Sequence, residues 1–402
     1  MRHNVRLLFI VCVGYGFTKG LTDFAVPLYL KAKGHSFRDI GYIFTISAIA
    51  IFFLRIYLAR LSDLIGRKLF YVGALALTSL SYLGFPFMQR LAAMAGLKTA
   101  SDLSFGVRET MHATALYESR AHGYVHLQGM TRGTEMLFMG AGTLAAGFLI
   151  VGCGYAVPFV ASAVVLLATT GVFARWFVEP ADLERRGPQP GLVALLTTSF
   201  PRPILAIMAM GFLFGISISA SHYYVPPLFF QAKFGLDERA IAWIQLVHML
   251  SHVPALFLVG WLVKRRWKAV FFWTLLVEGV LLGLVGCFQT LAPTLVFWWT
   301  HDLIGAGLWA PLQWGLIQHY ARKDSRGLDA SVVPAVTALG CIFGPLLAGY
   351  LAEWTSLPAL GIAASAGGQA VSLPMIASGA MMSLSALPLL LLPPDRTREA
   401  SR

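Results

Sequence analysis

Long apolar stretches alternate with short polar segments along the whole chain. The apolar positions run continuously rather than at every second residue. A helix that crosses the hydrocarbon core needs about 20 predominantly apolar residues, whereas a membrane barrel strand shows alternation. The pattern therefore predicts an all-α integral membrane protein. Twelve spans are expected, at residues 5–30, 37–58, 69–88, 92–115, 129–151, 156–178, 203–229, 239–262, 269–288, 292–318, 331–353 and 371–392.

The fourth predicted span, 92–115, is the least apolar of the set because it contains Lys98, Asp102, Arg108 and Glu109. A surface segment would have a similar composition. Without this span, however, the loops on either side would fall on the wrong faces of the membrane. We therefore expect residues 92–115 to cross the bilayer.

Composition and charge agree with a membrane location. The chain is 57% hydrophobic and 12% charged, whereas a soluble domain carries roughly 25% charged residues. With the N-terminus placed in the cytoplasm, 20 of the 31 Lys and Arg residues fall on cytoplasmic segments and 6 on outer loops. An excess of Lys and Arg marks the cytoplasmic side. Both termini are therefore expected inside, and the net charge of +12 requires no nucleic acid partner.

Short segments recur at a nearly constant offset of 195 to 202 residues. This recurrence predicts two pseudo-symmetric six-helix bundles, 1–178 and 202–402, joined by a polar, proline-containing cytoplasmic linker at 179–201. The recurring pairs are Gly16 to Gly20 with Gly211 to Gly215, Val26-Pro27 with Val225-Pro226, Ala32-Lys33 with Ala232-Lys233, Gly34 with Gly235, and Gly140 with Gly340.

A charged hairpin joins the second and third spans. Residues 59–68 read Ala-Arg-Leu-Ser-Asp-Leu-Ile-Gly-Arg-Lys, and residues 260–268 form a fainter copy. Six helices, a linker and six related helices resemble the major facilitator superfamily over nearly the whole chain. The first signature of that family is matched here by four residues, while Ala59 and Leu64 depart from it. The matching residues are Asp63, Gly66, Arg67 and Lys68.

The resemblance implies a rocking transporter with a cytoplasmic latch. In the family, the acid of the hairpin bridges the two halves and favours the outward-facing state. Asp63, Arg67 and Glu118 match the partners of that latch. A simple loop anchor is the alternative. Lys264 stands where the second copy would need its acid, so the second hairpin is expected to serve only as an anchor.

Two further family signatures are altered. Lys98 replaces the arginine that the family places in span four, about twenty residues before Glu118. The Gly-x-x-x-Gly-Pro motif of antiporters is missing from span five, which has Gly140-Ala-Gly142 without a proline. A complete copy, Gly340 to Gly344 and Pro345, lies in span eleven. We expect it to allow bending of that span, with tight helix packing as the alternative.

Ionisable side chains inside the spans are the main candidates for a coupling or substrate site, because a charge in the bilayer is costly and usually faces a cavity. Mutual neutralisation and anchoring at the membrane surface are the alternatives. Glu278, in a peripheral span, is expected to be a structural pairing. The candidates are Lys19, Asp23, Lys98, Asp102, Arg132, Glu135, His222 and Asp302.

The sequence contains no P-loop and no nucleophile motif, so an enzyme is not expected, nor is a resident cofactor or metal. Transport would then draw on an ion gradient. We expect proton-coupled efflux of a small organic compound through Asp23, with Asp302 and Glu135 as further proton-carrying candidates. Proton-linked uptake of an organic ion is one alternative. A metal-ion carrier that uses His248 and His252, one turn apart in span eight, is another.

The expected setting is the inner membrane of a bacterium, where the protein is a monomer embedded in the lipid bilayer. Its expected partners are a small-molecule substrate and protons. The sequence does not reveal which substrate is carried, because the shape of the cavity determines it.

Overall fold

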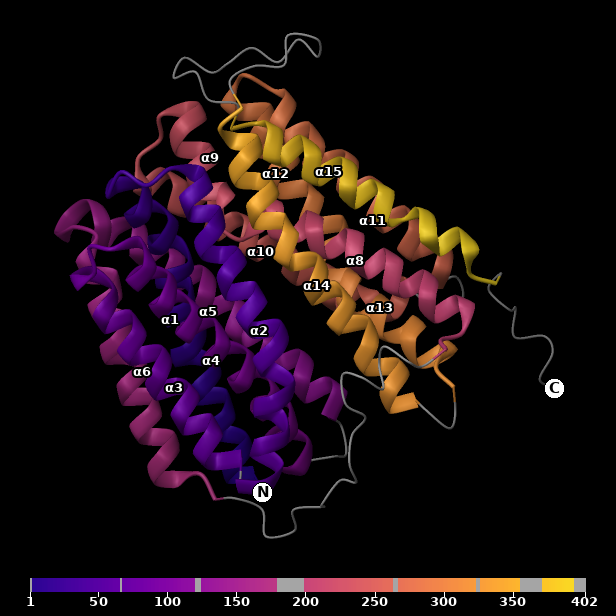
Figure 1. Ribbon diagram of the computed structural model, residues 1–402, viewed down its shortest axis with the longest axis horizontal. Helices are drawn as coiled ribbons and strands as arrows, with labels where there is room; N and C mark the ends of the chain where they lie inside the picture. The colour runs from indigo at the N-terminus through magenta and orange to yellow at the C-terminus, as the bar shows by residue number, and fades with distance from the viewer. Residues whose placement is uncertain are drawn as a thin grey trace. The chain divides into compact units, whose positions relative to one another are not determined.

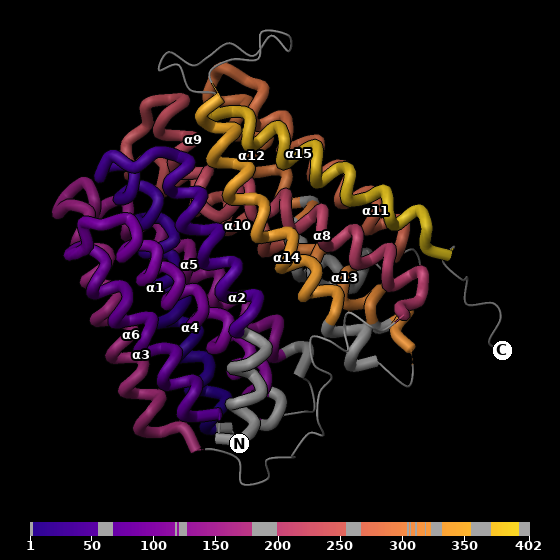
Figure 2. Tube along the Cα trace, viewed as in Figure 1, coloured from indigo at the N-terminus to yellow at the C-terminus, as the bar shows by residue number. Residues whose placement is uncertain are grey.

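The structure is a computed structural model that describes residues 2–65, 67–119, 124–178, 199–262, 267–322, 326–354 and 371–393. Some side chains within these ranges are left undescribed, among them those of 55–65, 117–118, 255–262 and 326–331. Figure 2 traces the path of the chain, with colour on the described residues.

Every regular element among the described residues is a helix. The first half of the chain contains α1 (Arg2–Ala32), α2 (Phe37–Ile65), α3 (Arg67–Gly84), η1 (Phe85–Phe87), α4 (Leu91–Ser119), α5 (Tyr124–Cys153) and α6 (Ala156–Trp176). The second half contains α8 (Arg202–His222), α9 (Val225–Phe234), α10 (Glu238–Leu262), α11 (Trp267–Cys287), α12 (Leu291–Ile304), α13 (Ala306–Tyr320), α14 (Arg326–Ala352), α15 (Leu373–Ser385) and η4 (Leu387–Leu391).

Each predicted span coincides with one helix or with two consecutive ones. The seventh span is divided into α8 and α9, because Pro226 and Pro227 begin a new helix after Tyr223 and Tyr224. The tenth span is divided at Gly305 into α12 and α13. Within the described residues, 9 helices are long and apolar enough to cross a membrane. Three predicted spans are not among these nine, namely α4, α10 and the tenth span, whose two helices contain 14 and 15 residues. The number is nevertheless consistent with twelve spans, because α4 contains several charges and part of α10 lacks described side chains.

The predicted fourth span is a continuous helix, α4, in spite of its charges. It packs against both α2 and α3. Lys98 and Arg108 are buried within the protein, although composition alone would place them on a surface. Helix α4 is thus a charged helix enclosed by apolar neighbours.

The chain divides into two compact units, one made of Met1–Arg186 and Tyr224–Leu250, the other of Gly187–Tyr223 and Ser251–Arg402. Residues 179–198 of the predicted linker lie outside the described residues. The boundary predicted at 179–201 therefore stays a prediction. Helix α9 and the first part of α10 belong to the same compact unit as α1 to α6.

Helix pairings in the first unit are repeated in the second. Helix α1 packs against α5 and α6, as α8 packs against α14 and α15. Helix α3 packs against α4 and α6, as α11 packs against α12 and α15. Figure 1 shows α1 beside α5 and, separately, α8 beside α14. Gly34 and Gly235, predicted to correspond, both have positive φ, +86° and +65°, where the chain turns into α2 and α10.

Glycine residues allow the close crossing of α1 with α5 and that of α8 with α14. A Cβ atom on Gly142 would overlap the backbone oxygen of Phe17 in α1. A Cβ atom on Gly340 would overlap the backbone oxygen of Phe212 in α8. The residue equivalent to Gly340 is therefore Gly142 and not Gly140, which faces the side chain of Leu246. Both crossings are the small-residue contacts typical of membrane helices.

Each of the two hairpins ends in a lysine, and the two lysines make equivalent contacts. Lys68, at the start of α3, donates a hydrogen bond from Nζ to the backbone oxygen of Phe177 at 2.7 Å. Lys268, at the start of α11, donates from Nζ to the backbone oxygen of Leu392 at 2.5 Å. In each unit a lysine therefore satisfies carbonyl groups at the end of the last helix, where the helix dipole favours a positive charge.

We expect Gly142→Ala to lower the stability of the protein in detergent by about 1–3 kcal/mol, because the added methyl group has no room at the α1–α5 crossing. Gly171→Ala in α6 is the matched control, since no atom lies within 4 Å of its added Cβ. Thermal unfolding of the two variants beside the unmodified protein measures the effect. Equal stability of the two variants would contradict the close approach of α1 and α5.

Candidate functional site

A buried ion pair joins α4 to α5 in the first unit. The Nη1 atom of Arg108 lies 2.7 Å from Oε2 of Glu135, and the two side chains are 1% and 7% exposed. The guanidinium group of Arg108 also lies 4.3 Å from the centre of the Tyr15 ring in α1. Its Nη2 atom donates to the sulfur of Cys12 at 3.8 Å. Three helices therefore surround one buried cation.

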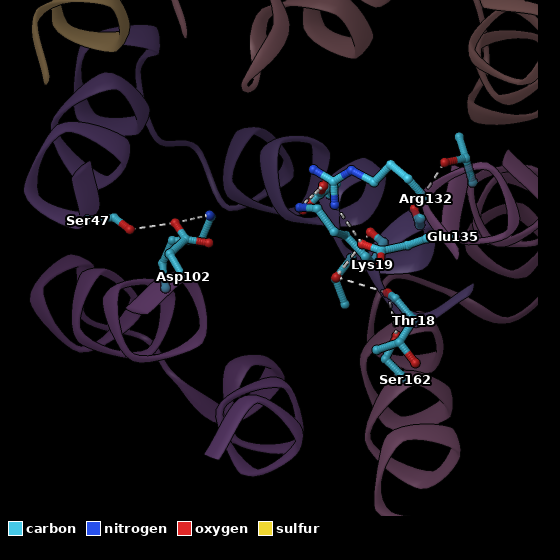
Figure 3. A network of polar contacts seen from close by, with 12 residues as sticks. Thr18, Lys19, Ser47, Asp102, Arg132, Glu135 and Ser162 are labelled. Atoms are coloured by element: carbon cyan, nitrogen blue, oxygen red, sulfur yellow. Dashed lines mark hydrogen bonds and ion pairs between the residues drawn. The ribbon is translucent and has the colours of Figure 1, made fainter. Parts of the chain in front are cut away.

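Arg132 extends this pair into a four-residue network. Its Nη2 atom lies 2.9 Å from Oε1 of Glu109, and its Nη1 atom lies 3.4 Å from Oε1 of Glu135. With Arg108, the network contains two cations and two anions, so its formal charge is balanced. Figure 3 shows Arg132 and Glu135 side by side in this network. Arg132 and Glu135, two of the candidate residues, are thus paired with each other, and each has a further partner on α4.

Lys19 and Asp23 form an ion pair one turn apart on α1, with Nζ and Oδ2 2.5 Å apart. The Asp23 side chain is 41% exposed, the most open of the paired acids in the spans of this unit. The Lys19 ammonium group lies 4.7 Å from the centre of the Phe105 ring in α4. The two candidates are thus paired on one helix face, as the alternative of mutual neutralisation expects.

Lys98 and Asp102 form an equivalent pair on α4. The hydroxyl of Ser47 in α2 donates to Oδ2 of Asp102 at 2.5 Å, as Figure 3 shows. The Lys98 ammonium group lies 4.4 Å from the centre of the Phe44 ring, also in α2. This pair therefore links α4 to α2.

A second polar cluster lies in the second unit. His222 in α8, His252 in α10, and His301 and Asp302 in α12 direct their side chains at one another. The three Nε2 atoms lie 3.9, 3.3 and 3.5 Å from Oδ2 of Asp302, in that order. His222 and Asp302 were both predicted site residues, and the structure brings them together. His248, the other predicted metal candidate, is buried in α10.

The predicted latch is only partly described. The side chains of Asp63 and Glu118, and the residue Gly66, lie outside the described residues. Arg67 is buried at the start of α3, while Lys68 binds the end of α6. The latch therefore stays a prediction.

The predicted helix-bending motif takes part in close packing. Gly344, like Gly340, faces the backbone of α8, where a Cβ atom would overlap the backbone oxygen of Ile216. Helix α14 continues through Pro345 to Ala352. This geometry agrees with the packing alternative, and bending during function stays a prediction.

A groove in the first unit is unrelated to these charges. It has a volume of about 320 Å³ and lies between α3 and α4, lined by side chains such as Leu69, Leu77 and Leu103. Its lining is almost entirely apolar. A groove of this composition suits a lipid chain better than a polar substrate, so we do not assign the functional site to it.

Three residues of this network, Arg108, Glu109 and Tyr15, are not recognisable as site residues from the sequence. Arg108 and Glu109 carried one signal, namely charge within a span. Their partners lie on a different helix, 27 and 23 residues away in sequence, so no local spacing reveals the pairing. In the sequence, nothing distinguishes Tyr15 from other aromatic residues. Its role is visible only in the fold, where Arg108 lies over its ring.

Two repeated bundles of apolar helices, with ionisable side chains buried inside them, define an integral membrane protein of the secondary transporter class. The sequence model described as Major Facilitator Superfamily matches residues 8–237 and 207–402. The chain belongs to this superfamily, as its sequence resemblance indicated.

Relatives and solved structures agree with this assignment. "Multidrug resistance protein 2" of Bacillus subtilis (strain 168) is 26% identical over 351 residues, which cover 83% of this chain and 84% of that protein. A point mutant of the nucleoside transporter NupG has a TM-score of 0.77 at 12% identity, covering 96% of this chain and 99% of that one. A bacterial homolog of the human lysosomal transporter Spinster has a TM-score of 0.72 at 11% identity, with 96% and 95% coverage. At these identities the structures show the fold alone.

We expect Glu135→Met to lower stability by about 3–5 kcal/mol, because it leaves the buried guanidinium group of Arg108 without its carboxylate. Arg108→Met should lower stability by less, because Glu135 keeps Arg132 as a partner at 3.4 Å. The double variant should lose less than the sum of the two. Glu109→Gln, which affects a more exposed pair, should lose no more than about 1 kcal/mol. Unfolding of the four purified variants in detergent measures these losses, and additive effects of the two buried residues would refute their pairing.

Proposed function

We propose that the protein is a proton-coupled exporter of small organic compounds in the cytoplasmic membrane of a bacterium. The observation that carries the proposal is the Lys19–Asp23 pair, which places a 41% exposed carboxylate inside a spanning helix. A proton-carrying group must exchange protons with the aqueous phase and must change the charge balance when it does so. The exposure of Asp23 and its pairing with a cation support this role.

The buried acid Glu135 is a weaker candidate for this role. It faces two guanidinium groups, those of Arg108 and Arg132, and its side chain is only 7% exposed. Two neighbouring cations hold a carboxylate in its charged form. We therefore assign Glu135 to the stable framework of the bundle and Asp23 to coupling.

Protonation of Asp23 would remove the partner of Lys19. An ammonium group without a counter-charge is unfavourable inside a membrane protein. Asp102 also attracts Lys19 electrostatically and is the next acid available to it. The protonated state would therefore favour a conformation in which Lys19 turns from Asp23 toward another anion, either Asp102 or an anionic substrate.

The direction of transport rests on the named relative. The Bacillus subtilis relative is named as a multidrug resistance protein, which supports export of organic compounds. Uptake of an organic ion driven by protons uses the same chemistry in the opposite direction. Flux measurements in both directions separate the two.

We expect Asp23→Asn to abolish substrate-dependent proton movement. The protein would be reconstituted in liposomes that contain a pH-sensitive dye, and a panel of organic cations and anions would be added. The amide cannot take up a proton, so the dye response should fall to that of empty liposomes. Glu109→Gln, the same chemical change in the structural network, should retain the response. An unchanged response in Asp23→Asn would remove this residue from the coupling role.

Native cysteines provide a test of the proposed orientation. Cys153 and Cys287 are exposed at the ends of α5 and α11, which the proposal places on the outer face, whereas Cys12 is buried. We expect a membrane-impermeant maleimide added to intact cells to label Cys153 and Cys287 and to leave Cys12 unlabelled. Cys153→Ser and Cys287→Ser identify each labelled site. Labelling only after the cells are opened would reverse the orientation.

A further inference from the structure

Glu278 is an acidic residue buried in α11 beside elements that carry no permanent positive charge. Its side chain has no exposed surface, and neither of its carboxyl oxygens has a hydrogen-bond partner among the described residues. Helix α11 packs against α12, α13, α15 and η4. None of these four elements contains a Lys or an Arg. The structural pairing expected for Glu278 is therefore absent from the part of the chain that the structure describes.

The charged group that acts on Glu278 is another acid. Asp302, in α12, repels it electrostatically. Lys268 lies in the first turn of α11, where its Nζ atom donates to the backbone oxygen of Leu392. The last two residues of α13 lie at the end of that helix opposite to Gly305. The titratable residues of α11 and of the elements packed against it are, apart from Glu278, Lys268, Cys287, His301, Asp302, His319 and Tyr320.

The surroundings of the two acids differ, and this difference indicates which of them holds a proton. The Nε2 atoms of His252 and His301 lie 3.3 and 3.5 Å from Oδ2 of Asp302. Glu278 has no comparable contact among the residues described. Burial without a hydrogen-bond donor and a neighbouring like charge both favour the neutral form of an acid. Glu278 is therefore the acid of this pair that is better placed to be protonated.

The carboxyl group of Glu278 lies where the tenth span is divided. A Cβ atom on Gly305, between α12 and α13, would overlap the Cγ, Cδ and Oε2 atoms of Glu278. The carboxyl group thus occupies the space that a side chain at position 305 would need. The N–H of Gly305 donates to the backbone oxygen of His301 at 3.0 Å, and its own oxygen accepts from Leu308 and Trp309 at 2.9 and 3.1 Å. Because Gly305 is bonded to both helices, movement of either one changes the surroundings of the carboxyl group.

The start of α13 provides a place for the ionised form. The first N–H groups of a helix have no partner within that helix, and the helix dipole favours an anion beside them. Helix α13 has 15 residues, and no side chain caps its N-terminus at Gly305. In this conformation the oxygens of Glu278 accept no hydrogen bond from these groups. A shift of α13 toward the carboxyl group would supply donors to the carboxylate and so favour release of the proton.

We propose that Glu278 is a second proton-binding site, which is shielded from water in this conformation and opens when α12 and α13 move about Gly305. Asp23, in the first unit, is 41% exposed and exchanges protons with water in the same conformation. A transporter with alternating access can carry a shielded proton from one side to the other without leakage. The role of Glu278 in transport rests on the proposed proton coupling, whereas the presence of its proton does not.

Infrared spectroscopy of the purified full-length protein in detergent detects the bound proton directly. At neutral pH we expect a carbonyl band of a protonated carboxylic acid, and Glu278→Gln should lose it. Glu109→Gln should keep the band, because Glu109 forms an ion pair with Arg132 at 2.9 Å. A band of equal intensity in Glu278→Gln and in the unmodified protein would overturn the proposal.

A second variant keeps the proposal testable if Glu278→Gln folds poorly. The added methyl group of Gly305→Ala displaces the carboxyl group, so this variant should shift the band rather than remove it. Gly283→Ala in α11 is the matched control, because the atoms nearest to its added Cβ are 3.8 and 3.9 Å away. The same band position in both variants would refute a proton held against Gly305.

Proton movement in liposomes tests the role of the site in transport. With Asp23 intact, Glu278→Gln should lower the number of protons moved per substrate by about twofold, because one of two proton-binding acids remains. An unchanged ratio in a folded Glu278→Gln would remove this residue from coupling. If the unmodified protein moves no protons with any substrate, the proposed function itself is contradicted, and the infrared band alone then decides whether Glu278 binds a proton.

Discussion

A guanidinium group buried in a membrane protein requires a carboxylate within reach, and much of the first unit is arranged around that requirement. Arg108 of α4 meets Glu135 of α5 at 2.7 Å. Gly16 allows α1 to contact the backbone of Glu135, where any Cβ atom would overlap. The neighbouring residue Tyr15 then lies against the guanidinium group. One ion pair thus determines where three helices approach, because the cost of separating the charges exceeds that of adjusting apolar contacts.

Sequence patterns predicted the helices well because apolar length is a local property. They also located the Lys19–Asp23 pair, since its members are four residues apart on one helix. They did not predict the pairing of Arg108 with Glu135 or of Asp302 with His252, because these contacts depend on helix packing. The repeat predicted Gly140 as the counterpart of Gly340, whereas the structure gives Gly142. The offset between equivalent residues of the two halves varies by a few residues along the chain. Only the helix crossing in the structure shows which glycine occupies the equivalent position.

The two halves share a fold and differ in how they compensate buried acids. In the first half, Lys19, Lys98 and Arg108 stand inside spans and provide permanent positive charge. In the second half, histidines face Asp302. A permanent cation favours the ionised form of a neighbouring carboxylate, whereas histidine is charged only when it is protonated. The two halves therefore compensate their buried acids with different kinds of side chain.

The lysine contacts at Phe177 and Leu392 have a consequence for the independence of the halves. Each lysine fastens the end of the last helix to the start of the third helix of the same half, and so closes that bundle without help from the other. Each half therefore has its own contact between its third helix and its last helix, which is the arrangement expected of two related modules in one polypeptide.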